Sequence, residues 1–156
     1  MKSRSICLFL IAILSASALQ AQNAKADSSA VAATLKELCK VCRSFDFKDP
    51  QTIELGVFYK AARFIAYRGE DKARSWKDAA NYRKADEKKG VDEVCERING
   101  TINRDTAFKI IKYLTEKESE GNWHVLVVTY NKKGVTKQAT FAFLKIGEKF
   151  LLGDID

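Results

Sequence analysis

The first part of the chain carries apolar residues at helical spacing. Between residues 27 and 43, apolar side chains are separated by four, three and four positions: Val31, Leu35, Leu38 and Cys42. Residues at these spacings lie on one side of an α-helix, while the polar residues between them face outward. The pattern therefore predicts an amphipathic helix over residues 27–43.

Two further helices are predicted. Asp49 can cap a helix whose first residue is Pro50, because the missing amide hydrogen of proline costs nothing at that position. The apolar stripe of this second helix is Ile53, Val57, Phe58, Ala61, Phe64 and Ile65. The stripe of a third helix, which we expect to end near Asn103, is Val91, Val94, Cys95, Ile98 and Ile102. Between the two, residues 67–89 have weak periodicity, and we expect a loop with helical turns.

After Arg104 the apolar period changes to two, which is the period of a β-strand. In the first strand we expect one face to carry Phe108, Ile110 and Lys112, and the other to carry Lys109, Ile111 and Tyr113. Three more strands are expected over residues 123–130, 139–144 and 150–155, with short turns at 131–134 and 147–148. Consecutive strands on short turns pair as neighbours, so the fold class is α+β, with three N-terminal helices packed on a four-stranded antiparallel meander sheet.

The second and third strands are apolar on both alternate sets of positions. A sheet that has helices on one face and water on the other should be polar at every second position. We therefore expect the second face to be covered as well, at least in part. The cover is either the helices wrapping around a curved sheet, a ligand in a concavity, or a second subunit of a homodimer.

Residues 1–21 have the form of a secretory signal peptide. A basic start is followed by an uncharged run at 6–14 and by small residues that end at Ala21. The apolar run is much shorter than the roughly 20 residues that span a bilayer. We expect cleavage after Ala21 or after Ala26, which leaves a single mature domain, residues 22–156, that is secreted or periplasmic and has no stable membrane anchor.

Charge and composition narrow the possible functions. The chain of 156 residues carries +7 formally, but removal of the signal takes Lys2 and Arg4 from the 27 basic residues and leaves 25 against 20 acidic ones, a net charge of +5. The remaining charges are mixed in sign, as in residues 116–120, whereas a nucleic-acid interface needs a basic stripe. With one His and four Cys in the chain, we expect no metal site, no cofactor and no His-centred catalytic triad.

Three cysteines remain after signal cleavage: Cys39, Cys42 and Cys95. The first two have the C-x-x-C spacing of a redox dithiol, but they come late in a predicted helix, where no helix start stabilises a thiolate. The plainer interpretation is that both thiols pack in the core as small apolar groups. A bridge from Cys95 to one of them is the other possibility, and spacing does not choose its partner.

The order of these elements resembles the nuclear transport factor 2-like superfamily. The resemblance covers residues 28–156 and is carried by the helical stretch 60–65, the strand 123–130 and the final run 141–154, an apolar strand, a glycine turn and an aromatic-led strand that closes with Gly-Asp. It implies helices wrapped around a strongly curved antiparallel sheet, which together form a cone. Isomerases, cyclases, dehydratases and accessory subunits all use this scaffold, so the fold does not decide the function.

A binding role is the leading hypothesis for this domain. Residues 67–82 combine cationic and aromatic side chains suited to stacking and anion contacts, and the strand 123–130 adds two aromatic residues. The candidate binding residues are Tyr67, Arg68, Arg74, Trp76, Tyr82, Trp123 and Tyr130. The plainer alternative is a lid that buries Trp76 against the open end of the sheet. We expect a non-enzymatic exported domain that binds a small apolar molecule or a protein partner through these residues and the concave sheet face.

Two other functions are open on the sequence. Enzymes that resemble this scaffold, such as ketosteroid isomerase, use an Asp base with a Tyr or acid donor in the pocket, so an isomerase-like or hydrolase-like site could use Asp154 or His124 with a tyrosine. The tyrosines considered are Tyr59, Tyr113 and Tyr130, and Asp156 is a further acidic candidate. A thiol redox protein that uses Cys39 and Cys42 is the third hypothesis.

Overall fold

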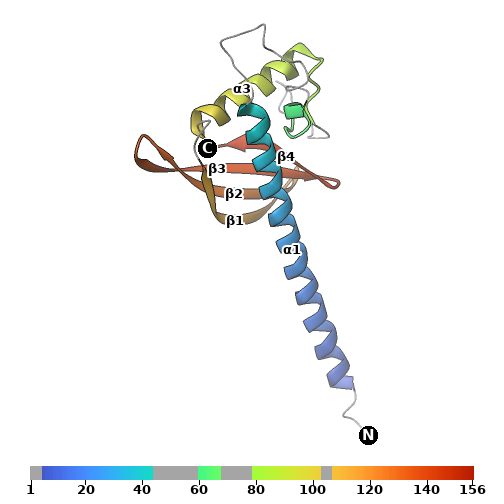
Figure 1. Ribbon diagram of the computed structural model, residues 1–156. Helices are drawn as coiled ribbons and strands as arrows, with labels where there is room; N and C mark the ends of the chain where they lie inside the picture. Colours follow the sequence, from blue (N-terminus) through green and yellow to red (C-terminus); the bar gives the residue numbers. More distant parts are fainter. Residues whose placement is uncertain (1–4, 44–59, 68–78, 103–106) are drawn as a thin grey trace.

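A computed structural model describes residues 5–43, 60–67, 79–102 and 107–156, with side chains of the first helix described from Asn23 onward. The elements are α1 (Ser5–Arg43), α3 (Ala85–Thr101), β1 (Phe108–Glu118), β2 (Gly121–Lys132), β3 (Val135–Ile146) and β4 (Lys149–Ile155) (Figure 1). Residues 60–62 are also helical. The predicted second helix lies outside the described residues up to position 59.

The four strands form one antiparallel sheet in the order β1-β2-β3-β4, which confirms the predicted meander. The β2–β3 turn places Lys133 and Gly134 at positive φ, 54° and 80°, and the side-chain oxygen of Asn131 accepts a hydrogen bond from the Gly134 amide at 2.8 Å. Gly147 begins the β3–β4 turn with a φ of 60°. Both turns therefore have the backbone that two-residue hairpins require.

A β-bulge in β1 changes the predicted alternation. Ile110 pairs with Val128 and Lys112 with Val127, so Ile111 lies between them without a strand partner and is 50% exposed. Beyond the bulge, Tyr113 pairs with Leu126 and returns to the face that carries Ile110. The prediction that Lys112 shares the face of Phe108 and Ile110 was wrong, because the extra residue shifts the phase of the strand by one.

One face of the sheet is covered by α1 and α3. Val31, Leu35, Leu38 and Cys42 of α1 are fully buried, which confirms the predicted apolar face, although the helix begins at Ser5 and not near Asp27. They belong to one apolar core with residues of α3 and of the sheet: Val91, Cys95, Ile98, Leu126, Val128, Phe141, Phe143 and Leu152. The N-terminal half of α1 runs away from the sheet into open space (Figure 1).

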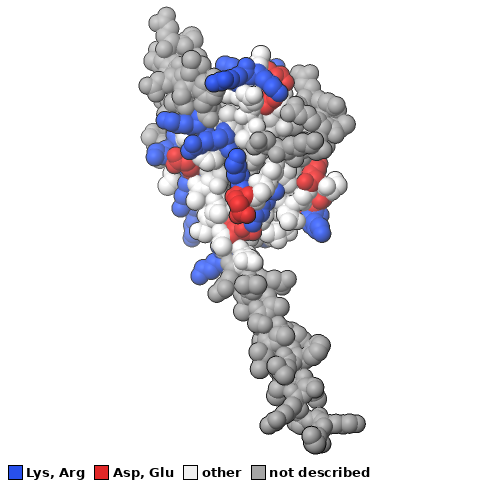
Figure 2. Space-filling view, turned by 90° about the vertical axis from the view of Figure 1, so that its right-hand side faces the viewer, with Lys and Arg blue, Asp and Glu red and all other residues white. Residues whose placement is uncertain are grey.

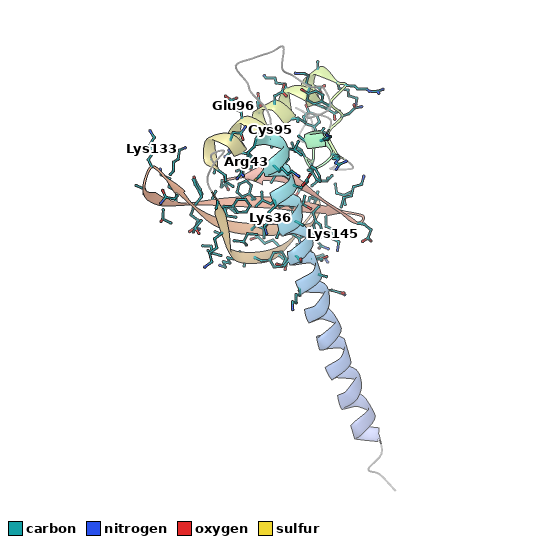
Figure 3. The ribbon with its side chains drawn as sticks, in the orientation of Figure 1. Lys36, Arg43, Cys95, Glu96, Lys133 and Lys145 are labelled. Atoms are coloured by element: carbon teal, nitrogen blue, oxygen red, sulfur yellow. A yellow bond between two sulfur atoms is a disulfide. The ribbon has the colours of Figure 1, made fainter. Side chains whose placement is uncertain are left out.

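A disulfide joins the ends of the two helices. Cys42 near the end of α1 is bonded to Cys95 of α3, and Figure 3 shows Cys95 beside the end of α1 next to Arg43. Close by, the side-chain amide of Asn99 donates a hydrogen bond to the Cys42 carbonyl at 2.9 Å. The bridge from Cys95, left open on the sequence, is thus made to Cys42, and Cys39 stays a free thiol.

The third helix begins earlier than its apolar stripe indicates. It starts at Ala85, so the prediction of a loop as far as Lys89 was wrong for the last five of those residues. The first turn carries Asp86 and Glu87, whose negative charges interact favourably with the positive end of the helix dipole. The helix therefore begins in a charged segment that precedes the first residue of its apolar stripe.

The second face of the sheet is apolar and buried too. Its residues include Val125, Val127, Leu144 and Leu151, of which Leu144 is 0% and Leu151 1% exposed. None of the four belongs to the core cluster under the helices. The prediction that the second face is covered at least in part is confirmed for these four residues, whereas Thr140 and Ala142 on the same face of β3 are half-buried.

The outer surface carries charges of both signs. On the face shown in Figure 2, Asp and Glu side chains lie among the Lys and Arg side chains. Among the residues that the structure describes, no helix is both long enough and apolar enough to cross a membrane.

Candidate functional site

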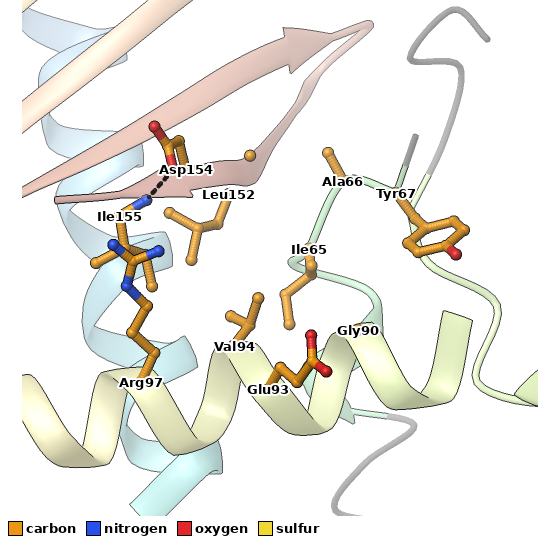
Figure 4. Close-up of a pocket in the computed structure, with 11 residues that line it drawn as sticks. Ile65, Ala66, Tyr67, Gly90, Glu93, Val94, Arg97, Leu152, Asp154 and Ile155 are labelled. Atoms are coloured by element: carbon orange, nitrogen blue, oxygen red, sulfur yellow. Dashed lines mark hydrogen bonds between the residues drawn. The ribbon is translucent and has the colours of Figure 1, made fainter. Parts of the chain in front are cut away.

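A cavity of about 410 Å³, which we call the edge cavity, lies between residues 65–67, α3 and the end of β4 (Figure 4). Its inner surface is apolar, and Figure 4 shows Ile65, Val94 and Leu152 pointing toward one another across it. Cavities of this size that combine an apolar lining with a few polar groups are typical of small-molecule sites.

Backbone pairing along the outer edge of β4 builds one wall of the edge cavity. The Leu152 amide donates to the Phe64 carbonyl at 2.8 Å, and the Ala66 amide donates to the Leu152 carbonyl at 2.8 Å. On the other edge of β4, where it pairs with β3, a register shift leaves Gly153 as an extra residue between Leu152 and Asp154. The bulge lets Leu152 and Ile155 both line the cavity, although they are three residues apart.

A glycine in α3 makes room for the aromatic ring at the mouth of the cavity. A Cβ atom on Gly90 would lie 3.2 Å from the Tyr67 ring, closer than ordinary van der Waals contact. The Tyr67 hydroxyl donates a hydrogen bond to the Asp86 carboxylate at 3.2 Å. The ring is therefore held against the first turns of α3.

Charged groups surround the opening of the edge cavity. Glu93 and Arg97 reach it from α3, and Asp154 reaches it from β4. Figure 4 shows the Arg97 side chain extending toward Ile155 and Asp154, whose carboxylate accepts a hydrogen bond from the Ile155 amide at 2.9 Å. An apolar interior with a charged opening suits a molecule that has an apolar body and a polar end.

Of the seven predicted binding residues, the four that the structure describes do not share one site. Tyr67 lines the edge cavity, but Tyr82 and Tyr130 are buried core residues, and the Tyr82 hydroxyl donates to Asp92 at 3.1 Å. Trp123 is half-buried on the opposite face of the sheet, in register with Leu144. The remaining candidates, Arg68, Arg74 and Trp76, lie outside the described residues.

A second cluster of polar residues lies at the far end of the helix-covered face. The Tyr113 hydroxyl and the Nδ1 atom of His124 are 2.7 Å apart, within hydrogen-bond distance. His124 is 3% exposed, and its ring contacts the edge of Phe150 at 4.8 Å between centroids. Burial lowers the pKa of His124 below its ordinary value and raises the pKa of Tyr113, so both groups are neutral at pH 7.

An ion pair stands beside these two residues. The Lys145 ammonium lies 2.8 Å from a carboxylate oxygen of Asp27, which ties α1 to the end of β3. The same ammonium lies 5.2 Å from the centre of the Phe150 ring. Asp27, Tyr113, His124 and Lys145 all line a cavity of about 340 Å³ under α1, which we call the helix cavity.

Reasoning on the sequence named His124 with a tyrosine and counted Tyr113 among three candidates, but it did not choose Tyr113 as the partner. The phase shift at Ile111 hid the contact, although two adjacent isoleucines in an alternating strand are a usable sign of a bulge. Asp27 was treated only as the start of a helix. Its contact with Lys145 spans 118 positions of the chain, and no local pattern indicates such a pair.

The cysteines do not form a redox dithiol. Cys42 is engaged in the disulfide, and Cys39 is 2% exposed, with burial raising the pKa of its thiol to about 12. A buried thiol of that pKa is neutral and inaccessible, whereas redox chemistry needs a thiolate. Within the described ranges, no three His, Cys, Asp or Glu side chains are grouped so that they could hold a metal ion.

Comparison with known proteins adds no assignment. The chain matches no family model, and neither a curated protein nor a solved structure is significantly similar to it. The function must therefore be argued from the two cavities.

Proposed function

We propose that the protein is an exported, non-enzymatic binding domain whose edge cavity takes a small molecule with an apolar body and a polar or anionic end. The observation that carries this proposal is the apolar lining of a cavity of about 410 Å³, with Arg97 at its opening. Ile65, Val94 and Leu152 would contact the apolar body, and the guanidinium group would contact the polar end.

Two features support export. Disulfides persist in oxidising compartments, and Cys42 and Cys95 form one. In addition, residues 1–21 have the pattern of a signal peptide, and the N-terminal half of α1 runs away from the folded body. A secreted or periplasmic location accounts for both. We further propose that the helices and meander sheet are an arrangement of the nuclear transport factor 2-like type.

The enzymatic alternative has less support at the edge cavity. The Asp154 carboxylate accepts a hydrogen bond from the Ile155 amide, and the Tyr67 hydroxyl donates to Asp86. The two groups therefore have different partners and do not converge on one substrate atom. Tyr113 and His124 do meet in the other cavity. The lowered pKa of His124 makes it a weaker base than an ordinary histidine, which favours a binding role there.

The binding proposal is tested with octanoate as the probe, because it joins an apolar chain to a carboxylate. Titration of the ¹⁵N-labelled mature protein should shift the amide signals of Val94, Arg97 and Ile155 in a saturable way. The Val94→Trp variant fills the cavity and should abolish the shifts. Val135→Trp is the matched control, because Val135 is an exposed residue of the β2–β3 hairpin, far from the cavity.

Arg97→Gln separates the polar contact from the apolar one. It should weaken octanoate about tenfold while leaving octanol unchanged, because only the carboxylate contacts the guanidinium. Equal shifts in the wild type and a folded Val94→Trp variant would contradict the proposed site.

A further inference from the structure

Two side chains of α3 bring opposite charges to the edge cavity. Glu93 and Arg97 both line it, and their spacing places them one turn apart on the same side of the helix (Figure 4). Val94, which follows Glu93, belongs to the apolar interior. The polar end of a ligand that contacts Arg97 therefore lies within one helical turn of a carboxylate.

Both charges are available to a ligand. Among the residues that the structure describes, Arg97 has no ion-pair partner, and Glu93 does not pair with it. A Glu93 carboxylate oxygen lies 3.8 Å from the ammonium of Lys89, and the two side chains are 65% and 79% exposed. An exposed ion pair of this length contributes little stability, so Glu93 can exchange Lys89 for a ligand.

The other acidic residue at the opening is directed elsewhere. Asp154 lines the cavity, but it is in register with Ala142 on the face of the sheet away from the helices. Its carboxylate accepts the hydrogen bond from the Ile155 amide. Glu93 is therefore the carboxylate that can meet a positive group of the ligand beside Arg97.

This pair of charges selects the kind of polar end. A ligand with a carboxylate alone is attracted by Arg97 and repelled by Glu93, whereas a ligand that also carries an ammonium group is attracted by both. An α-amino acid holds the two groups on one carbon atom. Its side chain leaves the same atom and can enter the interior, which Ile65, Val94 and Leu152 make apolar.

The dimensions agree with a compact ligand, because about 410 Å³ is near the lower end of the range for small-molecule sites. We propose that the edge cavity binds a free apolar amino acid such as leucine. The carboxylate contacts Arg97, the ammonium contacts Glu93, and the side chain fills the interior. This inference rests on the proposed function, since it names the ligand class of the same cavity.

Three probes of similar shape test the proposal. Leucine carries both charges, isocaproate has the same carbon skeleton without the ammonium, and isoamylamine lacks the carboxylate. Each is titrated into the ¹⁵N-labelled mature protein, with the amide signals of Val94, Arg97 and Ile155 as the readout. Leucine should bind about tenfold more tightly than either of the other two.

Glu93→Gln is the diagnostic variant. It keeps the size of the side chain but removes the charge that attracts the ammonium, so leucine should bind about tenfold more weakly and isocaproate no more weakly than to the wild type. Glu96→Gln is the matched control, because Glu96 is an exposed residue of the same helix that does not line the cavity. This control should bind leucine as the wild type does.

Two results would overturn the proposal. Leucine binding no more tightly than isocaproate would show that the ammonium is not recognised. Unchanged leucine affinity in a folded Glu93→Gln variant would remove Glu93 from the site. In either case, octanoate binding that Val94→Trp abolishes would still support the proposed function, whereas absence of octanoate binding as well would contradict both proposals.

Discussion

His124 is held neutral by burial and by the charge of a neighbouring lysine. Burial among apolar groups, including the edge of the Phe150 ring, disfavours the charged imidazolium, and the ammonium of Lys145 opposes it as well. Only Asp27 favours the charged form, and its carboxylate is already paired with Lys145. At the scale of single residues, the folded state therefore binds a proton at His124 less readily than the unfolded chain does.

Acidification should destabilise the protein through His124. The folded pKa lies below the ordinary value of 6.5, so the stability that the neutral histidine contributes is fully present above that value. It is lost as the pH falls toward the folded pKa, because the unfolded chain takes up the proton first. Urea unfolding midpoints of wild type and His124→Asn, measured between about pH 7 and pH 5, should show a steeper decline in the wild type. Parallel curves for the two proteins would argue against the neutral, buried histidine.

At the scale of elements, one extra residue, Ile111, accounts for the irregular apolar pattern of β1. Without Ile111, residues 108–113 would alternate regularly, with Phe108, Ile110 and Tyr113 at every second position. The structure places these three residues toward the helices and pushes Ile111 outward. The strand is thus a regular one with a single residue added.

Deletion of Ile111 should leave the Tyr113–His124 contact intact. The pairing of Ile110 with Val128 and of Lys112 with Val127 would close into a regular ladder with every side chain on its present face. Since no buried group is removed, the unfolding free energy should change by less than about 1 kcal/mol. The imidazole NMR signals should remain at their wild-type positions.

Deletion of Leu114 is the matched control. It lies in the regular part of β1, so its removal forces either Tyr113 or Thr115 off the helix-covered face. The imidazole signals should then move. If both deletions perturbed His124 equally, the bulge would not lie at Ile111.

The disulfide between α1 and α3 is the second feature at this scale. It connects residues 53 positions apart, so it restricts the unfolded chain strongly. Reduction, or the double variant Cys42→Ala and Cys95→Ala, should lower the unfolding free energy by about 2 to 4 kcal/mol. Urea titrations with and without reductant test this. Reductant should have no further effect on the double variant, and an unchanged wild type in reductant would contradict the prediction.

Most of the elements could be predicted from the sequence because one repeating physical pattern encodes each of them. The stripe of Val31, Leu35 and Leu38 and the glycine turn at Gly147 both depend on neighbours a few positions away. The cavities could not be predicted in the same way. They depend on two bulges and on contacts such as Asp27 with Lys145, in which side chains distant in the chain share one place.

At the scale of the whole molecule, the two halves of α1 have different surroundings. Val31 is the first described residue of the helix that is fully buried, and residues 23–26 are exposed. Among the described side chains of α1, Asp27 is the first with an ion-pair partner in the sheet. The folded body thus begins close to the two positions at which signal cleavage is predicted.

The exported protein should begin at Gln22. Cleavage there keeps Ala24 and Asp27, which both line the helix cavity, whereas cleavage after Ala26 removes Ala24. Intact mass and N-terminal sequencing of the exported protein measure the position. Ala21→Arg should block this cleavage, because the position before the cut requires a small residue. An exported chain that retains residues 1–21 would contradict the signal-peptide prediction.

The bulge at Ile111 also affects how the molecule meets copies of itself. β1 is the outermost strand of the sheet, and its free edge has no strand partner among the described residues. An extended, regular edge of this kind can recruit a strand from another chain, and bulges and lysines prevent that. Ile111 interrupts the edge, while Lys109, Lys112 and Lys117 place charge along it. The deletion of Ile111 is expected to leave the Tyr113–His124 contact intact. Its effect should instead be self-association and fibrillar aggregation at high concentration, because the edge strand becomes regular.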